Sequence, residues 1–193
     1  MEATRLRDKY SGQIDILIGF ESEWMGTPLH DTVKEAETSN IEYIQKIKEK
    51  HCNTLDFFIG SVHHVHRIPI DYSRELYLKA RDVASSVDRR RTGDHGPDGS
   101  SDDVLFKEYF DSQYDMLRTL KPLVVGHFDL IRLYSDRPDE PLRTSAELWK
   151  HVMRNLEFIA NYGGILEINS SSLRKGLTEP YPQLEICKVC CSP

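Results

Sequence analysis

Four short apolar runs in this chain end in polar or ionisable residues, and this repeated pattern constrains the fold more than any other feature. Each run is rich in β-branched residues and has the length of a buried strand. Stretches with helical periodicity lie between the runs, and alternation of strand and helix favours a parallel sheet. The sequence therefore predicts an α/β fold. The four predicted strands lie within residues 14–23, 55–64, 122–130 and 163–172.

The spacing of apolar residues predicts helices between these strands. Helical segments are expected within residues 32–51, 103–122 and 145–164. In the third segment apolar residues recur at intervals of three and four, as on one face of a helix. Gly163 follows this pattern and is a candidate C-cap, because glycine readily adopts the left-handed conformation that ends many helices.

The length and the order of these segments favour a single domain over residues 1–193. Residues 80–103 show no apolar period and are rich in Gly, Ser, Asp and Arg, so we predict a flexible surface loop there. The last residues, 189–193, form a divergent tail. Cysteines crowd this end of the chain, and we interpret them as incidental thiols because no other ligand pattern accompanies them.

Charge and hydropathy exclude several classes of partner. The chain carries 31 acidic and 25 basic residues, a formal net charge of −6, which argues against nucleic acid as the main partner. No segment approaches the roughly 20 apolar residues that span a bilayer, and the start of the chain lacks the apolar core of a secretory signal. We expect a cytoplasmic protein that binds cations or small polar ligands. The sequence leaves the oligomeric state open.

Strand alternation predicts which way the polar side chains point, because successive residues of a strand face opposite sides of the sheet. In the first strand, Glu21 lies on the face opposite Ile18 and Phe20. In the second strand, His63 shares a face with Ile59, and His64 points to the other side.

The same alternation applies to the last two predicted strands. Val125, His127 and Asp129 share one face of the third strand, and Ile165 and Glu167 share one face of the fourth. Each inner face is therefore expected to end in an ionisable group. His66 lies past the second strand and is interpreted as a loop residue.

These strand ends predict a metal site. The carboxyl ends of parallel strands meet at one edge of the sheet, where sites are commonly built. Glu21, His63 and His127 occur at this position on three successive strands. A lone histidine is more often a hydrogen-bonded structural residue than a ligand, but the repetition favours a site for zinc, iron or manganese.

The motifs around these residues resemble the histidinol-phosphatases of the PHP (polymerase and histidinol phosphatase) phosphoesterase superfamily, most closely the fungal type. The resemblance implies a distorted (β/α)7 barrel with two or three metal ions, zinc, manganese or iron, at its strand ends. It also implies hydrolysis of L-histidinol phosphate to L-histidinol and phosphate, a step of histidine biosynthesis. The four motifs read IGFESEW, IGSVHHVHRIPIDY, VVGHFDLIRLYSD and LEINSSSLRKG.

The resemblance assigns metal ligands residue by residue. Glu21 in the Gly-x-Glu motif matches the family's metal-bridging carboxylate. His63 and His127 match two of its metal-binding histidines. Strand alternation had already placed these three residues on inner faces.

The resemblance also suggests three residues that contact the substrate. Arg174 matches an arginine that the family offers to the substrate phosphate, for which a planar guanidinium is well suited. His64 is expected to contact the substrate or a neighbouring metal. Asp129 is expected to orient a ligand imidazole or to meet the substrate's ammonium group.

The chain departs from the family pattern at both ends. Family members begin with a His-x-His strand and end with an Asp-x-His strand, and neither motif is found here. The resemblance therefore implies a partial barrel with about four of the seven strand-helix units. Three hypotheses follow: a histidinol-phosphatase, a catalytically inactive truncated fragment of one, or a PHP phosphatase acting on another phosphomonoester.

Overall fold

A four-stranded parallel sheet forms the centre of the molecule in a computed structural model, which describes residues 2–25, 34–92 and 101–190. The four strands lie in the sheet in the same order as along the chain. This order is found in barrels of strand-helix units. All four strands lie within the predicted segments, and the α/β fold is confirmed. The strands are β1 (Gly19–Glu23), β2 (Phe57–Ser61), β5 (Val124–Val125) and β6 (Ile165–Leu166).

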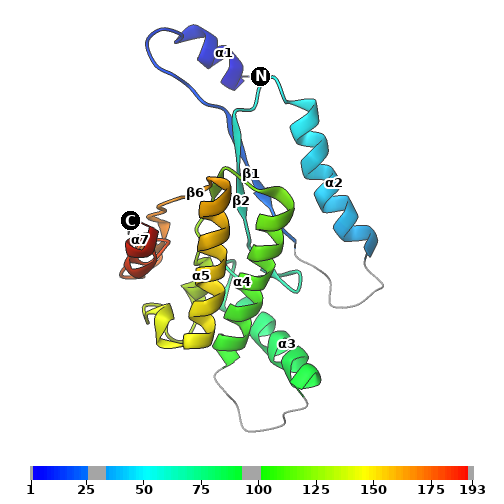
Figure 1. The fold of residues 1–193 in the computed structure, drawn as a ribbon, viewed down its shortest axis with the longest axis vertical. Helices are drawn as coiled ribbons and strands as arrows, with labels where there is room; N and C mark the ends of the chain where they lie inside the picture. The colour runs from blue at the N-terminus through cyan, green and yellow to red at the C-terminus, as the bar shows by residue number, and fades with distance from the viewer. Residues whose placement is uncertain (1, 26–33, 93–100, 191–193) are drawn as a thin grey trace.

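Helices connect these strands and flank the sheet (Figure 1). The three predicted helical segments correspond to α2, α4 and α5 and are confirmed. A short antiparallel hairpin of β3 and β4 follows β2. The remaining bounds are α1 (Glu2–Lys9), α2 (Lys34–Lys50), β3 (His64–Val65), β4 (Ile68–Pro69), α3 (Arg74–Thr92), α4 (Ser101–Leu120), α5 (Ala146–Tyr162), α6 (Ser171–Arg174) and α7 (Leu184–Cys190).

The prediction of a loop over residues 80–103 is wrong for most of that range, because helix α3 runs from Arg74 to Thr92. Ala80, Ala84 and Val87 are buried at intervals of four and three residues, and α3 packs against α4. Two of these three buried positions are alanines, which contribute little hydrophobic signal to a sequence pattern. Residues 93–100 of the predicted loop lie outside the described residues.

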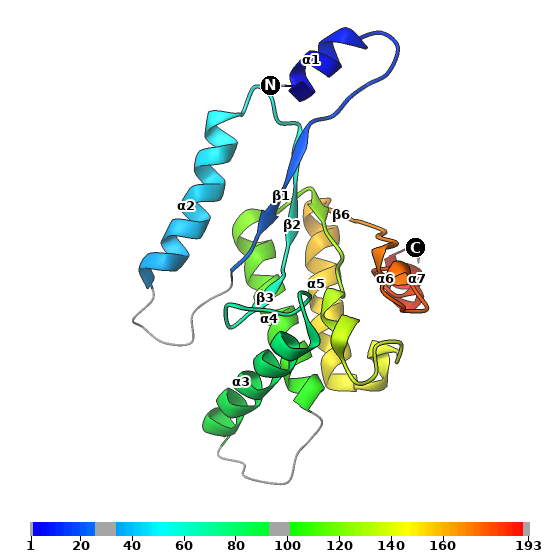
Figure 2. The ribbon, with the colours of Figure 1, turned by 180° about the vertical axis from the view of Figure 1, so that it is seen from behind.

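The two faces of the sheet differ in their covering. Figure 1 and Figure 2 show α4 and α5 side by side on one face. Phe58 and Val125 are buried on this face, and a Cβ atom on Gly60 would lie 2.6 Å from the Pro122 ring at the end of α4. Residues paired across parallel strands share a face. The pairing of Glu21 with Ile59 therefore places Glu21 on the opposite, more open face.

The C-terminal part of the chain contains the last described helix. α7 includes residues 189 and 190 of the predicted tail, and residues 191–193 lie outside the described part of the chain. None of the described helices combines the length and the apolar character needed to cross a membrane.

Helix α5 ends as the sequence predicts. Gly163 has a φ of 77° and its amide donates to the Ala160 carbonyl. A Cβ atom at this position would meet no atom within 4 Å, so a substitution affects only the backbone conformation.

We expect Gly163→Ala to lower the free energy of unfolding by about 1 kcal/mol, because an L-residue with a side chain is disfavoured at positive φ. Gly163→Asn should cost less, since asparagine tolerates this conformation. Urea unfolding of the three proteins measures the difference. Equal stability of the wild type and the alanine variant would contradict this explanation.

Candidate metal centre

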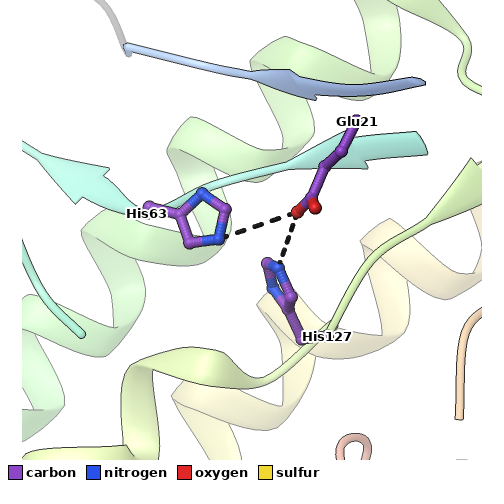
Figure 3. A group of neighbouring side chains, drawn as sticks. All are labelled: Glu21, His63 and His127. Carbon is purple, nitrogen blue, oxygen red and sulfur yellow. Dashed lines mark hydrogen bonds and ion pairs between the residues drawn. The ribbon is translucent and has the colours of Figure 1, made fainter. Parts of the chain in front are cut away.

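Glu21, His63 and His127 converge at the carboxyl ends of three adjacent strands. Glu21 belongs to β1, His63 follows β2 and His127 follows β5. One potential ligand atom from each residue lies within 4.8 Å of the others, and Figure 3 shows the three side chains pointing toward one another. The structure therefore brings together the three residues that the sequence suggested as metal ligands.

The Glu21 carboxylate links the two imidazoles. Its Oε1 atom lies 3.1 Å from Nε2 of His127 and 3.7 Å from Nε2 of His63. The centroids of the two imidazole rings are 4.6 Å apart. The hydrogen bond with His127 lowers the pKa of Glu21 to about 2, so the carboxylate is charged at neutral pH.

This donor set suits a divalent transition metal. Imidazole nitrogen and carboxylate oxygen are common ligands of zinc, and they also suit iron and manganese. Both histidines direct Nε2 toward the same carboxylate oxygen. The three residues are therefore arranged so that one metal ion fits between these atoms with the strands as they are.

Glu23, which the sequence reasoning missed, contacts both neighbouring histidines of the second strand. Its Oε2 atom contacts Nδ1 of His63, and its Oε1 atom lies 2.9 Å from Nδ1 of His64. Burial alone would raise the pKa of Glu23, but the two imidazoles lower it to about 2. The sequence held a signal for this residue, since Glu23 lies two positions after Glu21 and hence on the same face of β1.

The predicted orientation of His64 is therefore wrong. Strand alternation placed His64 opposite His63, yet both imidazoles meet the Glu23 carboxylate. The physical reason is that β2 ends at Ser61 and His64 begins the separate strand β3, so the alternation along β2 extends to neither histidine.

The side chain of His127 points to the cluster, but not because of the predicted strand alternation. Val125, which was expected to share its face, is fully buried on the side of the sheet covered by helices. His127 has a φ of 24°, and this departure from strand geometry turns its side chain toward Glu21. Its amide donates to Oε2 of Glu167 at 3.0 Å. Glu167 had been placed on an inner face but was not selected as a site residue.

Gly126 leaves room for this arrangement. A Cβ atom there would lie 2.6 Å from the Ser61 hydroxyl and 3.0 Å from the Ile59 side chain. Such contacts are closer than van der Waals packing permits, so a larger residue would displace the backbone that carries His127.

Asp129 does not occupy the predicted position at the site. Its side chain is fully buried, and Oδ2 accepts hydrogen bonds from Nε of Arg132 at 3.0 Å and from the amide of Gln183 at 2.9 Å. Neither the His127 imidazole nor solvent is a partner of this carboxylate in the described structure. The 3-10 helix that begins at Leu130 brings Arg132 back to it, which explains the correction. Burial raises the pKa of Asp129 to about 6, although the nearby Arg132 charge opposes this.

Arg174 and His66 lie outside the cluster. Arg174 is exposed at the end of α6, and its suggested contact with a phosphate stays a prediction. His66 occupies the turn between β3 and β4 with a φ of 53°, and its imidazole contacts Glu108 of α4. The sequence interpretation of His66 as a loop residue agrees with this turn, but the buried contact with α4 was not foreseen.

A family model for the PHP domain matches residues 2–171 of this chain. The chain belongs to the PHP domain family. Two curated fungal relatives match nearly all of it. The Schizosaccharomyces pombe protein named "Probable histidinol-phosphatase" is 38% identical over 189 residues, which cover 97% of this chain and 53% of the relative. The Saccharomyces cerevisiae protein named "Histidinol-phosphatase" is 32% identical over 206 residues, which cover 96% and 54%.

A solved PHP-type structure supports the fold. A Listeria monocytogenes protein described as a candidate histidinol phosphatase superposes with a TM-score of 0.68 at 18% sequence identity. The match covers 98% of this chain and 64% of the other. The chain thus spans about half the length of the curated relatives that it matches.

We expect zinc to bind this chain more weakly as the pH falls. Burial alone would lower the pKa of His63, but its contact with Glu23 raises that pKa above the ordinary value, so protons compete with zinc from near-neutral pH downward. Each imidazole that protonates should weaken binding by about tenfold per pH unit.

Isothermal titration with zinc over a series of pH values measures this dependence. His127→Gln should abolish most of the affinity. His151→Gln, which alters a histidine of α5, is the control and should leave zinc binding unchanged. A zinc affinity that does not depend on pH would contradict the expectation.

We also expect Arg132→Met to lower the free energy of unfolding by about 3–5 kcal/mol, because it leaves the buried Asp129 carboxylate without its cation. The double variant Asp129→Asn/Arg132→Met should recover part of this loss, since it removes the buried charge as well. Denaturant unfolding of both variants provides the measurement. A double variant no more stable than the single one would show that the charge is not the cause.

Proposed function

We propose that this protein is a metal-dependent phosphomonoester hydrolase that converts L-histidinol phosphate and water to L-histidinol and phosphate. The observation that carries the proposal is the convergence of Glu21, His63 and His127 at the carboxyl edge of the parallel sheet. The similarity to two proteins named as histidinol-phosphatases supports the choice of substrate. A role in histidine biosynthesis also agrees with the cytoplasmic location expected from the sequence.

The three residues of the cluster would hold a divalent ion, zinc, manganese or iron. Such an ion, when bound, supplies a water of lowered pKa and neutralises charge on the phosphoryl oxygens. Glu21 contributes a carboxylate that is charged throughout the physiological pH range, given its pKa of about 2. His63 and His127 would contribute imidazole Nε2 atoms from just beyond the ends of two further strands.

Two other residues are proposed to contact the substrate. Arg174 presents a planar guanidinium that can pair with two phosphate oxygens. His64 has its Nδ1 atom next to Glu23, and its Nε2 atom remains for a polar group of the substrate. We do not assign Asp129 to the substrate, because its carboxylate is buried against Arg132.

A second hypothesis is that this chain by itself has no activity. The coverage of the curated relatives favours it, since only about half of their length corresponds to this chain. The family site is expected to contain two or three metal ions, whereas the described residues offer one cluster of three ligands. A third hypothesis, hydrolysis of a different phosphomonoester, requires only a change in the residues that contact the alcohol part of the substrate.

An assay of phosphate release from L-histidinol phosphate, with zinc, manganese or iron added, tests the proposal. We expect turnover to fall at least about 100-fold in Glu21→Gln, because even partners of metal ligands contribute 10–100-fold to activity or affinity. Glu157→Gln, which changes an exposed residue of α5, is the matched control and should retain full activity.

The possible results separate the three hypotheses. Metal binding without release of phosphate from any phosphomonoester would favour the inactive chain. Turnover of another phosphomonoester but not of L-histidinol phosphate would favour the third hypothesis.

A further inference from the structure

Glu23 makes more contacts with the histidines of the site than any of the proposed ligands does. Its Oε1 atom accepts from the amide of His63 at 3.1 Å and lies 2.9 Å from Nδ1 of His64. Its Oε2 atom contacts Nδ1 of His63. Both carboxylate oxygens are therefore directed to residues 63 and 64, although β1 and these histidines are about forty positions apart in the chain.

These contacts leave Glu23 unsuited to be a metal ligand itself. Glu21, two residues earlier on the same strand, directs its carboxylate to the Nε2 atoms of His63 and His127. Glu23 instead meets the opposite ring nitrogen of His63. The two glutamates of β1 thus contact the two sides of one imidazole.

We propose that Glu23 is a positioning residue that holds both His63 and His64 in the tautomer protonated at Nδ1. A carboxylate can only accept a hydrogen bond, so each Nδ1 atom that it contacts must carry the proton. The Nε2 atom of a neutral imidazole is then unprotonated and able to bind a metal or to accept a proton. The assignment of the tautomers follows from the contacts of Glu23 alone. It rests on the proposed function only for the roles of the two Nε2 atoms, which are to bind metal or substrate.

The arrangement also accounts for how the chain around these histidines is ordered. His63 lies between β2 and β3, and His64 is the first residue of the two-residue strand β3, so neither histidine continues the strand geometry of β2. The bond from the His63 amide to Glu23 replaces the missing ladder bond at this point. Glu23 therefore determines both the position of the backbone and the protonated nitrogen of each ring.

Nuclear magnetic resonance of the metal-free chain labelled with 15N-histidine tests the proposal. At a pH where the imidazoles are neutral, long-range proton-nitrogen correlations report which ring nitrogen carries the proton. Signals are assigned by their loss in His63→Gln and His64→Gln. We expect the wild-type chain to show protonated Nδ1 on both residues.

In Glu23→Gln we expect at least one of the two rings to lose its fixed Nδ1 proton, because the amide has one accepting oxygen and its nitrogen donates. Zinc affinity measured by titration should fall by about 10–100-fold, the usual effect of losing a partner of a metal-bound histidine. Glu108→Gln is the matched control, since the Glu108 carboxylate also contacts an imidazole, at Nε2 of His66, but outside the cluster. It should leave the signals of His63 and His64 and the affinity for zinc unchanged.

Two results would overturn the proposal. One is a wild-type chain in which His63 carries its proton on Nε2, and the other is a Glu23→Gln variant that keeps Nδ1 protonated on both rings. Because the tautomers are read without metal, a chain that shows them as expected but binds no zinc would count against the metal-dependent function and not against the role of Glu23. Loss of the tautomers in Glu23→Gln with a preserved unfolding midpoint would support the proposal independently of stability.

Discussion

The parallel pairing of β1 with β2 is the constraint on which the candidate site depends. Its register places Glu21 beside Ile59 and Glu23 beside Ser61, so both glutamates lie on the open face just before His63. A shift by one residue would turn both carboxylates to the face covered by helices, because side chains alternate along a strand. Burial of Phe58 in the apolar core opposes such a shift, so the core of the sheet also maintains the site.

Carboxylates outside the ligand cluster help to position His63 and His127. Glu23 contacts the Nδ1 side of His63, and Glu167 accepts a hydrogen bond from the amide of His127. His127 occupies an unusual backbone conformation, which such a bond helps to stabilise. Glu23 lies in β1, beside the strand that His63 follows, and Glu167 directly follows β6, which pairs with the strand that His127 follows. The arrangement of both imidazoles therefore depends on the pairing of the strands.

Three errors of the sequence interpretation share a cause, which is that the alternation of a strand was extended beyond the end of that strand. Alternation along β2 and β5 was applied to His64 and to His127, although β2 ends at Ser61 and β5 at Val125. Asp129 was read in the same way, yet it precedes a 3-10 helix and pairs with Arg132. The loop prediction failed differently, since the buried face of α3 is formed partly by alanines that contribute little to a hydrophobic period.

The sequence by itself determined the α/β class, the positions of the four strands along the chain, three of the helices and the residues Glu21, His63 and His127 of the cluster. These follow from short-range periodicity and from the rule that parallel strands share one carboxyl edge. Only the tertiary structure decided that Glu23 contacts both His63 and His64 and that Asp129 forms a buried ion pair with Arg132. Such choices depend on strand register and on where each strand ends, and both are set by packing between segments far apart in the chain.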